Sequence, residues 1–218
     1  DLVEHLDATV VWVGDSEGGH GSGFFVTPDG YLLTNDHVVR NNGDLFVRTL
    51  DRDYLRVNIV KTDEELDLAL LRVVNPQRTF KSVAIGNSRQ LRKGQSVLNI
   101  GNPLDEEYEH SVTPGHIAGL NRHKGAIQLS LPTYSGQSGS PVFDMNGRVI
   151  GIIVSGATRI EGVDIYTEAK DDNNSSQQTG SDTTKYDKQT VGIKYSADTI
   201  GFAIPIDYAR GLLELARP

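Results

Sequence analysis

The sequence Tyr31-Leu32-Leu33-Thr34-Asn35-Asp36-His37 joins a short strand pattern to a histidine at its end. The turn signal Pro28-Asp29-Gly30 stands directly before it, so the strand has a defined start. A general base in a β-protein must be held at such a strand end, at a barrel rim, with its ring free. The stretch therefore predicts a β-fold and a catalytic His37, although a lone histidine is more often structural.

Short apolar runs separated by turn signals extend outward from this strand over most of the chain. Six such runs precede about residue 75 and six more follow residue 93, and six strands are enough to close a small barrel. The last segment has apolar residues at helical spacing from Ile206 to Ala216, with Asp207 as the expected N-cap. We predict one all-β domain over residues 1–218. Its parts are an N-terminal barrel at about 8–75, a connection at 76–93, a C-terminal barrel at 94–205 and a C-terminal helix at 206–218.

A second candidate residue lies in the run Leu66-Asp67-Leu68-Ala69-Leu70-Leu71. An acidic side chain in an apolar environment is costly unless it is paired. A catalytic histidine needs a carboxylate of this kind to hold the tautomer of its imidazole and to stabilise the imidazolium. We therefore predict that Asp67 partners His37. The alternative is an aspartate at a strand start that faces solvent.

The third candidate is Ser138, within Gly136-Gln137-Ser138-Gly139-Ser140-Pro141. Flanking glycines let the backbone turn sharply and expose the hydroxyl of Ser138. The loop Gly136, Gln137, Ser138 can also form an oxyanion hole, with the N–H groups of Gly136 and Ser138 directed at one point. Ordinary surface turns contain the same string, so the prediction for Ser138 rests on its occurrence together with His37 and Asp67. The order His, Asp, Ser belongs to the chymotrypsin-like double β-barrel, with the site in the cleft between barrels.

The composition of the chain limits the kinds of molecule that it is expected to bind. The formal net charge is −8 and no basic stripe exists to neutralise phosphates, so we expect no nucleic acid. The chain has no cysteine, which excludes disulfides and a cysteine nucleophile. The histidines are scattered with no pair at ligand spacing, so we expect no metal and no cofactor. No stretch is long and apolar enough to span a membrane.

One region is polar throughout. From Glu168 to Lys188 the apolar side chains are confined to Ala169 and Tyr186, too few to order the segment by burial. We expect a long polar loop at 157–198 that leaves the strand lining the specificity pocket. A gating or exosite role for this loop is one hypothesis, and a mobile insertion is the other.

The chain resembles the HtrA-type (Deg-type) serine proteases over nearly its whole length. The resemblance rests on Gly21–Phe24, Pro28–Val39, Asp67–Leu71, Gly94–Val97, Ile100–Pro103, Ser111–Ile117, Gly136–Val142 and Gly201–Pro205. It implies the double barrel, the triad His37, Asp67 and Ser138, and ATP-independent proteolysis of unfolded or flexible polypeptide segments. It also implies an extracytoplasmic setting (bacterial periplasm, envelope or secreted) or an organellar one. Members of the family often form homo-oligomers and usually carry PDZ modules after the protease domain, whereas this chain stops at Pro218.

Two departures from related enzymes matter for control and specificity. Gln137 stands where HtrA-type enzymes tend to have Asn and pancreatic-type enzymes have Asp, so we expect control by loop ordering rather than an ion-pair switch. The nucleophile segment and Thr133 also resemble glutamyl endopeptidases, but Ile153 stands where those enzymes have a pocket histidine. We therefore predict an apolar, medium-sized S1 pocket for Val, Ala or Leu. Its expected lining is Pro132, Thr133, Ile153, Val154 and Ser155.

The function predicted from these residues is that of a serine endopeptidase that works through an acyl-enzyme. The resemblance further implies a role in protein quality control or processing. The alternative is a protease-like fold that acts as a binding or chaperone module with a latent or inactive site. A scaffold whose long loop binds a partner is a further alternative.

Overall fold

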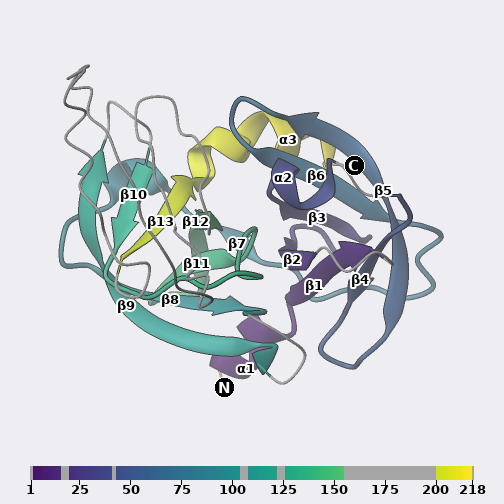
Figure 1. Ribbon diagram of the computed structural model, residues 1–218, viewed down its shortest axis with the longest axis horizontal. Helices are drawn as coiled ribbons and strands as arrows, with labels where there is room; N and C mark the ends of the chain where they lie inside the picture. Colours follow the sequence, from purple (N-terminus) through teal and green to yellow (C-terminus); the bar gives the residue numbers. More distant parts are fainter. Residues whose placement is uncertain are drawn as a thin grey trace, which may run out of the picture.

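The computed structural model describes residues 2–15, 20–40, 43–103, 108–121, 126–154 and 200–217. Its strands gather into two bodies that lie side by side, with the purple and blue strands in one and the teal and green strands in the other (Figure 1). A short helix, α1 (Leu2–Asp7), precedes them. Within the described ranges, no helix has both the length and the apolar character needed to cross a membrane.

The N-terminal body is a closed antiparallel barrel, as predicted. Its strands are β1 (Val10–Asp15), β2 (His20–Phe25), β3 (Tyr31–Thr34), β4 (Leu45–Arg48), β5 (Tyr54–Asp63) and β6 (Leu68–Val73). They run in the order β1-β2-β3-β6-β5-β4, and β4 pairs with β1 to close the ring. Val11, Val13, Phe25, Leu32 and Leu71 are among the buried side chains that fill it.

The C-terminal body is a second six-stranded antiparallel barrel. Its strands are β8 (Ser96–Gly101), β9 (Ser111–Asn121), β10 (Ala126–Leu129), β11 (Pro141–Asp144), β12 (Arg148–Val154) and β13 (Gly201–Pro205). The order is β11-β8-β9-β10-β13-β12, and pairing of β11 with β12 closes it. The connection expected at 76–93 contains β7 (Ala84–Ile85), which adds to β12 as a parallel neighbour. The polar loop expected at 157–198 lies outside the described residues.

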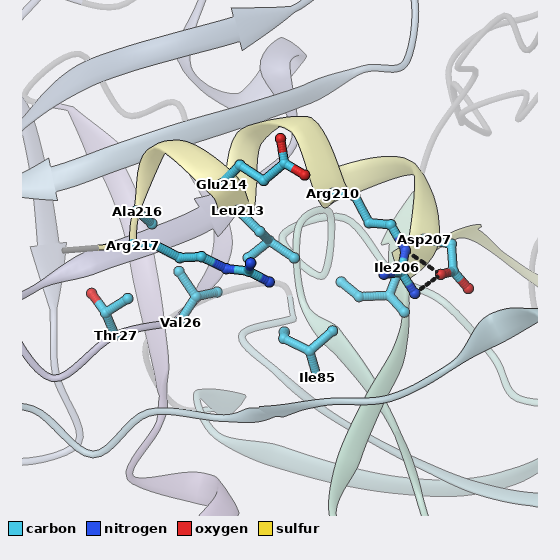
Figure 2. A pocket seen from close by; sticks show the side chains of 10 residues that line it. All are labelled: Val26, Thr27, Ile85, Ile206, Asp207, Arg210, Leu213, Glu214, Ala216 and Arg217. Atoms are coloured by element: carbon cyan, nitrogen blue, oxygen red, sulfur yellow. Dashed lines mark hydrogen bonds and ion pairs between the residues drawn. The ribbon is translucent and has the colours of Figure 1, made fainter.

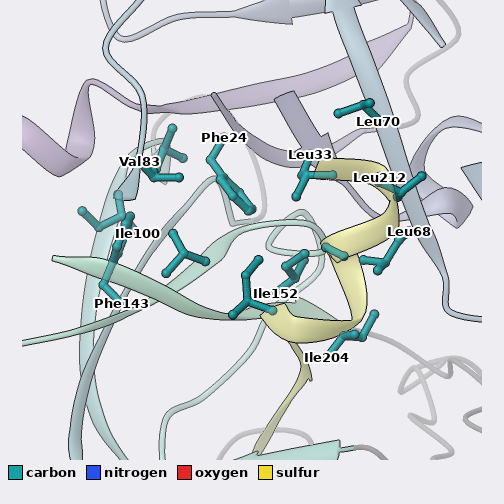
Figure 3. Packing of buried hydrophobic residues seen from close by; sticks show 14 of the residues in the cluster. Phe24, Leu33, Leu68, Leu70, Val83, Ile100, Phe143, Ile152, Ile204 and Leu212 are labelled. Atoms are coloured by element: carbon teal, nitrogen blue, oxygen red, sulfur yellow. The ribbon is translucent and has the colours of Figure 1, made fainter. Parts of the chain in front are cut away.

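A separate group of buried apolar side chains joins the two barrels (Figure 3). Phe24 comes from the N-terminal barrel, Phe143 and Ile152 come from the C-terminal barrel, and Leu212 comes from the C-terminal helix. Phe24 faces this joint while Phe25 points into its own barrel, because successive strand residues face opposite sides. Full burial of such side chains contributes about 1.5–3 kcal/mol each. The joint therefore sets the relative position of the barrels, and with it the geometry of anything built between them.

The C-terminal segment is helical, as predicted, but its start differs from the expectation. A 3-10 turn, η3 (Ile206–Ala209), runs into α3 (Arg210–Leu215), and neither has a side-chain cap. The N-cap prediction for Asp207 was wrong because the helix begins at Ile206, which places Asp207 inside the first turn. The Asp207 carboxylate instead accepts hydrogen bonds from the N–H and hydroxyl of Ser88, at 2.8 and 2.5 Å. Ser88 belongs to η1 (Ser88–Gln90).

Candidate functional site

Sheet register brings His37 and Asp67 together. Strands β3 and β6 are antiparallel, with Thr34 opposite Ala69, so the end of β3 lies beside the start of β6. His37 follows β3 on a single helical turn, α2 (Asp36–Val39), and Asp67 directly precedes β6. The His37 Nδ1 lies 3.0 and 2.8 Å from the two carboxylate oxygens of Asp67. Because Nδ1 contacts the carboxylate, Nε2 is the ring nitrogen that can exchange a proton with another group.

The Asp67 carboxylate is held in place from its own barrel. It also accepts the backbone N–H of His37 at 2.9 Å, and its side chain is 8% exposed against 29% for His37. Asp67 adopts a positive φ of 52°, an uncommon conformation for a residue other than glycine. The Asn35 amide donates to the Asp67 carbonyl at 2.9 Å and so secures this turn. The pair is thus set by backbone as well as by side chains.

A second acidic group, Asp36, lies beside this pair. Burial raises the pKa of the Asp36 carboxyl, and the positive charge of Arg40 opposes that rise. The negative charges of Asp67 and Glu64 add to the rise. Arg40 lies 3.2 Å from Asp36 and 3.8 Å from Asp67, so one guanidinium balances the carboxylates behind the imidazole.

The segment around Ser138 consists of two consecutive tight turns. The Gln137 N–H donates to the Tyr134 carbonyl at 3.1 Å, and the Ser140 N–H donates to the Gln137 carbonyl at 3.0 Å. Each turn has a glycine as its third residue, Gly136 with φ 89° and Gly139 with φ 87°, and the second residue of neither turn has a positive φ. That pattern defines type II turns, which need glycine at the third position. Ser138 is the second residue of the second turn.

The second turn packs against the segment that carries His37. The Ser22 N–H donates to the Ser138 carbonyl at 2.7 Å. A β-carbon added at Gly139 would lie 2.4 Å from the Thr34 hydroxyl oxygen and 3.1 Å from the Asn35 nitrogen. Thr34 and Asn35 directly precede α2, so the structure places the Ser138 turn, His37 and Asp67 in one region between the barrels. Ser138 itself is 4% exposed.

The Gln137 side chain is fully buried and points into the C-terminal barrel. Its Oε1 accepts the Tyr134 N–H at 2.8 Å, and its Nε2 donates to Asn99 Oδ1 at 3.3 Å. Asn99 in turn donates to the Ser140 hydroxyl at 2.8 Å. All groups in this network are uncharged, so the buried side chain at position 137 needs no ion-pair partner. The backbone N–H of Gln137 is engaged by Tyr134, so an oxyanion hole in this loop rests on Gly136 and Ser138.

The residues predicted to line the S1 pocket do not share one face. Ile153 is fully buried in the core of the C-terminal barrel, whereas Val154 faces the joint between barrels. The backbone of Ile153 accepts the Gly139 N–H at 2.9 Å and donates to the Ser140 carbonyl at 2.8 Å, which ties the nucleophile turn to β12. Pro132 and Thr133 are half-buried after β10. Ser155 lies outside the described residues.

Two buried polar residues at this site escaped the sequence interpretation. Ser22 and Asn102 meet at Gly136, where the Ser22 hydroxyl donates to the Gly136 carbonyl at 2.8 Å and accepts the Asn102 N–H at 2.9 Å. A Gly-Ser-Gly string and an Asn-Pro turn are the signals in the sequence, and neither reveals a contact across the two barrels.

A hollow of about 170 Å³ lies elsewhere, between α3 and the end of β2 (Figure 2). Its lining includes Val26, Ile85, Leu213 and Arg217, and none of the predicted site residues. In the part of the chain that the structure describes, no group of three or more metal-ligating side chains is present.

Comparison with protein families matches residues 21–152 to the trypsin-like peptidase domain. The matched stretch is well over half of the chain. It runs from β2 into β12 and includes His37, Asp67 and Ser138.

Similar proteins carry the name "probable periplasmic serine endoprotease DegP-like". The one from Pseudomonas putida (strain W619) is 40% identical over 138 residues, which are 61% of this chain and 28% of that protein. Those from Pseudomonas fulva (strain 12-X) and Hahella chejuensis (strain KCTC 2396) are 38% and 37% identical, over 28% and 29% of their lengths. The match therefore spans less than a third of these relatives.

Proposed function

Because the chain belongs to the trypsin-like peptidase domain family, we propose that it is a serine endopeptidase with Ser138 as its nucleophile. In this proposal His37 is the general base and Asp67 orients it. The observation that carries the proposal is the two-oxygen contact of Asp67 with His37 Nδ1, at 3.0 and 2.8 Å, beside the turn that holds Ser138.

The reaction follows from these positions. His37 Nε2 takes the proton of the Ser138 hydroxyl as Oγ attacks the scissile carbonyl, and Asp67 stabilises the imidazolium that forms. The tetrahedral intermediate collapses when the imidazolium gives that proton to the leaving amine, which leaves an acyl-enzyme. Water then attacks the ester with His37 again as base, and Ser138 regains its proton as the carboxylic acid leaves.

The turn geometry supports an oxyanion hole made by the N–H groups of Gly136 and Ser138. A type II turn differs from type I by a flip of its central peptide, which reverses the direction of the N–H of the third residue. The positive φ of Gly136 selects type II, and burial of this residue limits its return to type I. One such donor contributes about 10²–10³ in kcat.

The proposed substrates are flexible polypeptide segments with a medium-sized apolar P1 residue. Pro132 and Thr133, the half-buried members of the predicted lining, carry no charge, which supports this preference. The names of the relatives, which call them periplasmic, support the proposed extracytoplasmic location. The proposed role in protein processing or quality control rests on the resemblance to HtrA-type proteases. A peptide library would test the P1 preference, and cleavage dominated by Glu or Lys at P1 would refute it.

The test of the nucleophile is labelling with a fluorophosphonate, which loses fluoride to an activated serine. We expect one adduct by intact mass on the wild type and none on Ser138→Ala. No adduct on a folded wild type, together with peptide binding that survives Ser138→Ala, would instead establish the binding-module alternative.

A further inference from the structure

We propose that Asn102 is a positioning residue for the turn Tyr134–Gln137, and that His110 holds it in that role with support from Asp7 of the N-terminal helix. The inference rests on the proposed peptidase function and deepens it. It concerns the four-residue turn that orients the N–H of Gly136, called the oxyanion turn below.

The hydroxyl of Ser22 links Asn102 to the oxyanion turn through hydrogen bonds. Ser22 Oγ donates to the Gly136 carbonyl at 2.8 Å and accepts from the backbone N–H and the side-chain amide of Asn102 at 2.9 and 3.3 Å. A hydroxyl has one donor and two acceptor sites, so all three are in use. Ser22 is fully buried and Asn102 is 1% exposed, so water does not replace any of these partners.

Asn102 also contacts the oxyanion turn directly. A β-carbon added at Gly136 would lie 2.4 Å from the Asn102 carbonyl oxygen and 2.7 Å from His20 Nε2. The face of Gly136 on which a side chain would stand is therefore occupied by Asn102 and by His20 of β2. A shift of Asn102 moves the residue whose N–H is proposed to bind the oxyanion.

His110 connects Asn102 to the N-terminal helix. Asn102 Oδ1 accepts the backbone N–H of His110 at 3.1 Å, and His110 Nδ1 lies 2.7 Å from Asp7 Oδ1. His110 has a positive φ of 57°, a conformation that needs support from its surroundings. α1 is anchored on the C-terminal barrel, because Leu6 packs at Gly147 in the turn between β11 and β12. Asp7 can thus hold His110 against a fixed support.

A structural role and a positioning role predict different kinetics. Loss of a buried hydrogen bond that only stabilises the fold lowers the melting temperature and leaves kcat unchanged. Displacement of the oxyanion turn lowers kcat and leaves KM nearly unchanged, because the oxyanion develops only in the transition state. Misplacement of catalytic groups by about 1 Å can cost on the order of 10²-fold in rate.

The experiment measures kcat and KM on a peptide that the wild type cleaves. We expect Asn102→Ala and Ser22→Ala to lower kcat by about 10–100-fold, with KM within about twofold. Affinity for a peptide boronate, which forms the tetrahedral adduct, should fall with kcat, whereas affinity for the cleaved product peptide should not. Ser88→Ala is the matched control, since it removes a hydrogen-bonded hydroxyl far from this turn and should leave kcat unchanged.

The Asp7 variants test the relay separately. Asp7→Ala should lower kcat by roughly two- to fivefold, and Asp7→Asn should restore it, because the amide oxygen still accepts from His110. If Asn102→Ala does not fold, Ser22→Ala and Asp7→Ala decide the matter, and wild-type kcat in both overturns the proposal. Because every comparison is made with a wild type that cleaves, failure here leaves the peptidase assignment intact. A wild type that takes no fluorophosphonate label refutes the assignment itself.

Discussion

The two sides of the candidate site are built in different ways. The His37–Asp67 side lies within one barrel, where the pairing of β3 with β6 brings the two residues together. The Ser138 side consists of two glycine-dependent turns held by Ser22 from the other barrel and by Asn102. The position of the base therefore depends on local sheet register, whereas the position of the nucleophile loop depends on how the two barrels meet.

The largest expected effect is on the base side, with Asp67→Asn. The amide would offer His37 the wrong tautomer and no charge for the imidazolium, so kcat should fall by about 10⁴. Stopped-assay or burst kinetics on a peptide ester would measure it, with Arg40→Gln as a control that retains the carboxylate. A loss of less than tenfold would show that Asp67 does not serve as the partner of the base.

On the nucleophile side the sharpest change is Gly139→Ala. Its β-carbon would lie 2.1 Å from the Ser22 carbonyl oxygen, at a φ of 87° that an L-residue rarely adopts. We expect kcat to fall by about 10²-fold or more, because the second turn must move away from the N-terminal barrel. The His37–Asp67 pair should stay in place, which the NMR shift of the imidazole Nδ1 proton would report.

Gly211→Ala is the matched glycine control for that change. Gly211 lies in α3, and a β-carbon there would have no neighbour within 4 Å. Because alanine favours helix over glycine, we expect a gain of about 0.5–1 kcal/mol in stability by urea unfolding and no change in kcat. Equal kinetic losses in both glycine variants would contradict the distinction between them.

The smallest expected effect lies outside both sides, at Asp207. Burial alone would raise the pKa of Asp207, but the hydrogen bonds from Ser88 and the proximity of Arg210 outweigh it, and the pKa is lowered from 3.8. A lowered folded-state pKa contributes stability that is present above the unfolded value and lost as pH falls through the folded value. The stability difference between wild type and Asp207→Asn should therefore be constant at pH 5–7 and shrink below about pH 4. Urea unfolding across this range measures it, and a difference that grows on acidification would contradict the assignment.

Much of the fold was predictable because its signals are local. Apolar runs between turns located the strands of both barrels, and helical spacing located the C-terminal helix. The short elements α1, α2 and β7 were not predicted, because one or two turns of helix and two residues of strand are too short for a period to show. The cap at Asp207 was wrong since the competing partner, Ser88, is 119 residues away in the chain.

In the candidate site, as in the fold, local signals could be read from the sequence and contacts between distant residues could not. Residue type and order were enough to nominate His37, Asp67 and Ser138, because this chemistry demands those side chains next to strand ends and glycine turns. The sequence likewise predicted that the glycines beside Ser138 allow a sharp turn, whereas the two consecutive type II turns were found in the structure. Only the tertiary structure revealed that Ser22 and Asn102 meet at Gly136, and that Ile153 and Val154 face different cores. Such contacts join residues far apart in the chain, and their geometry is decided by the packing of one barrel on the other.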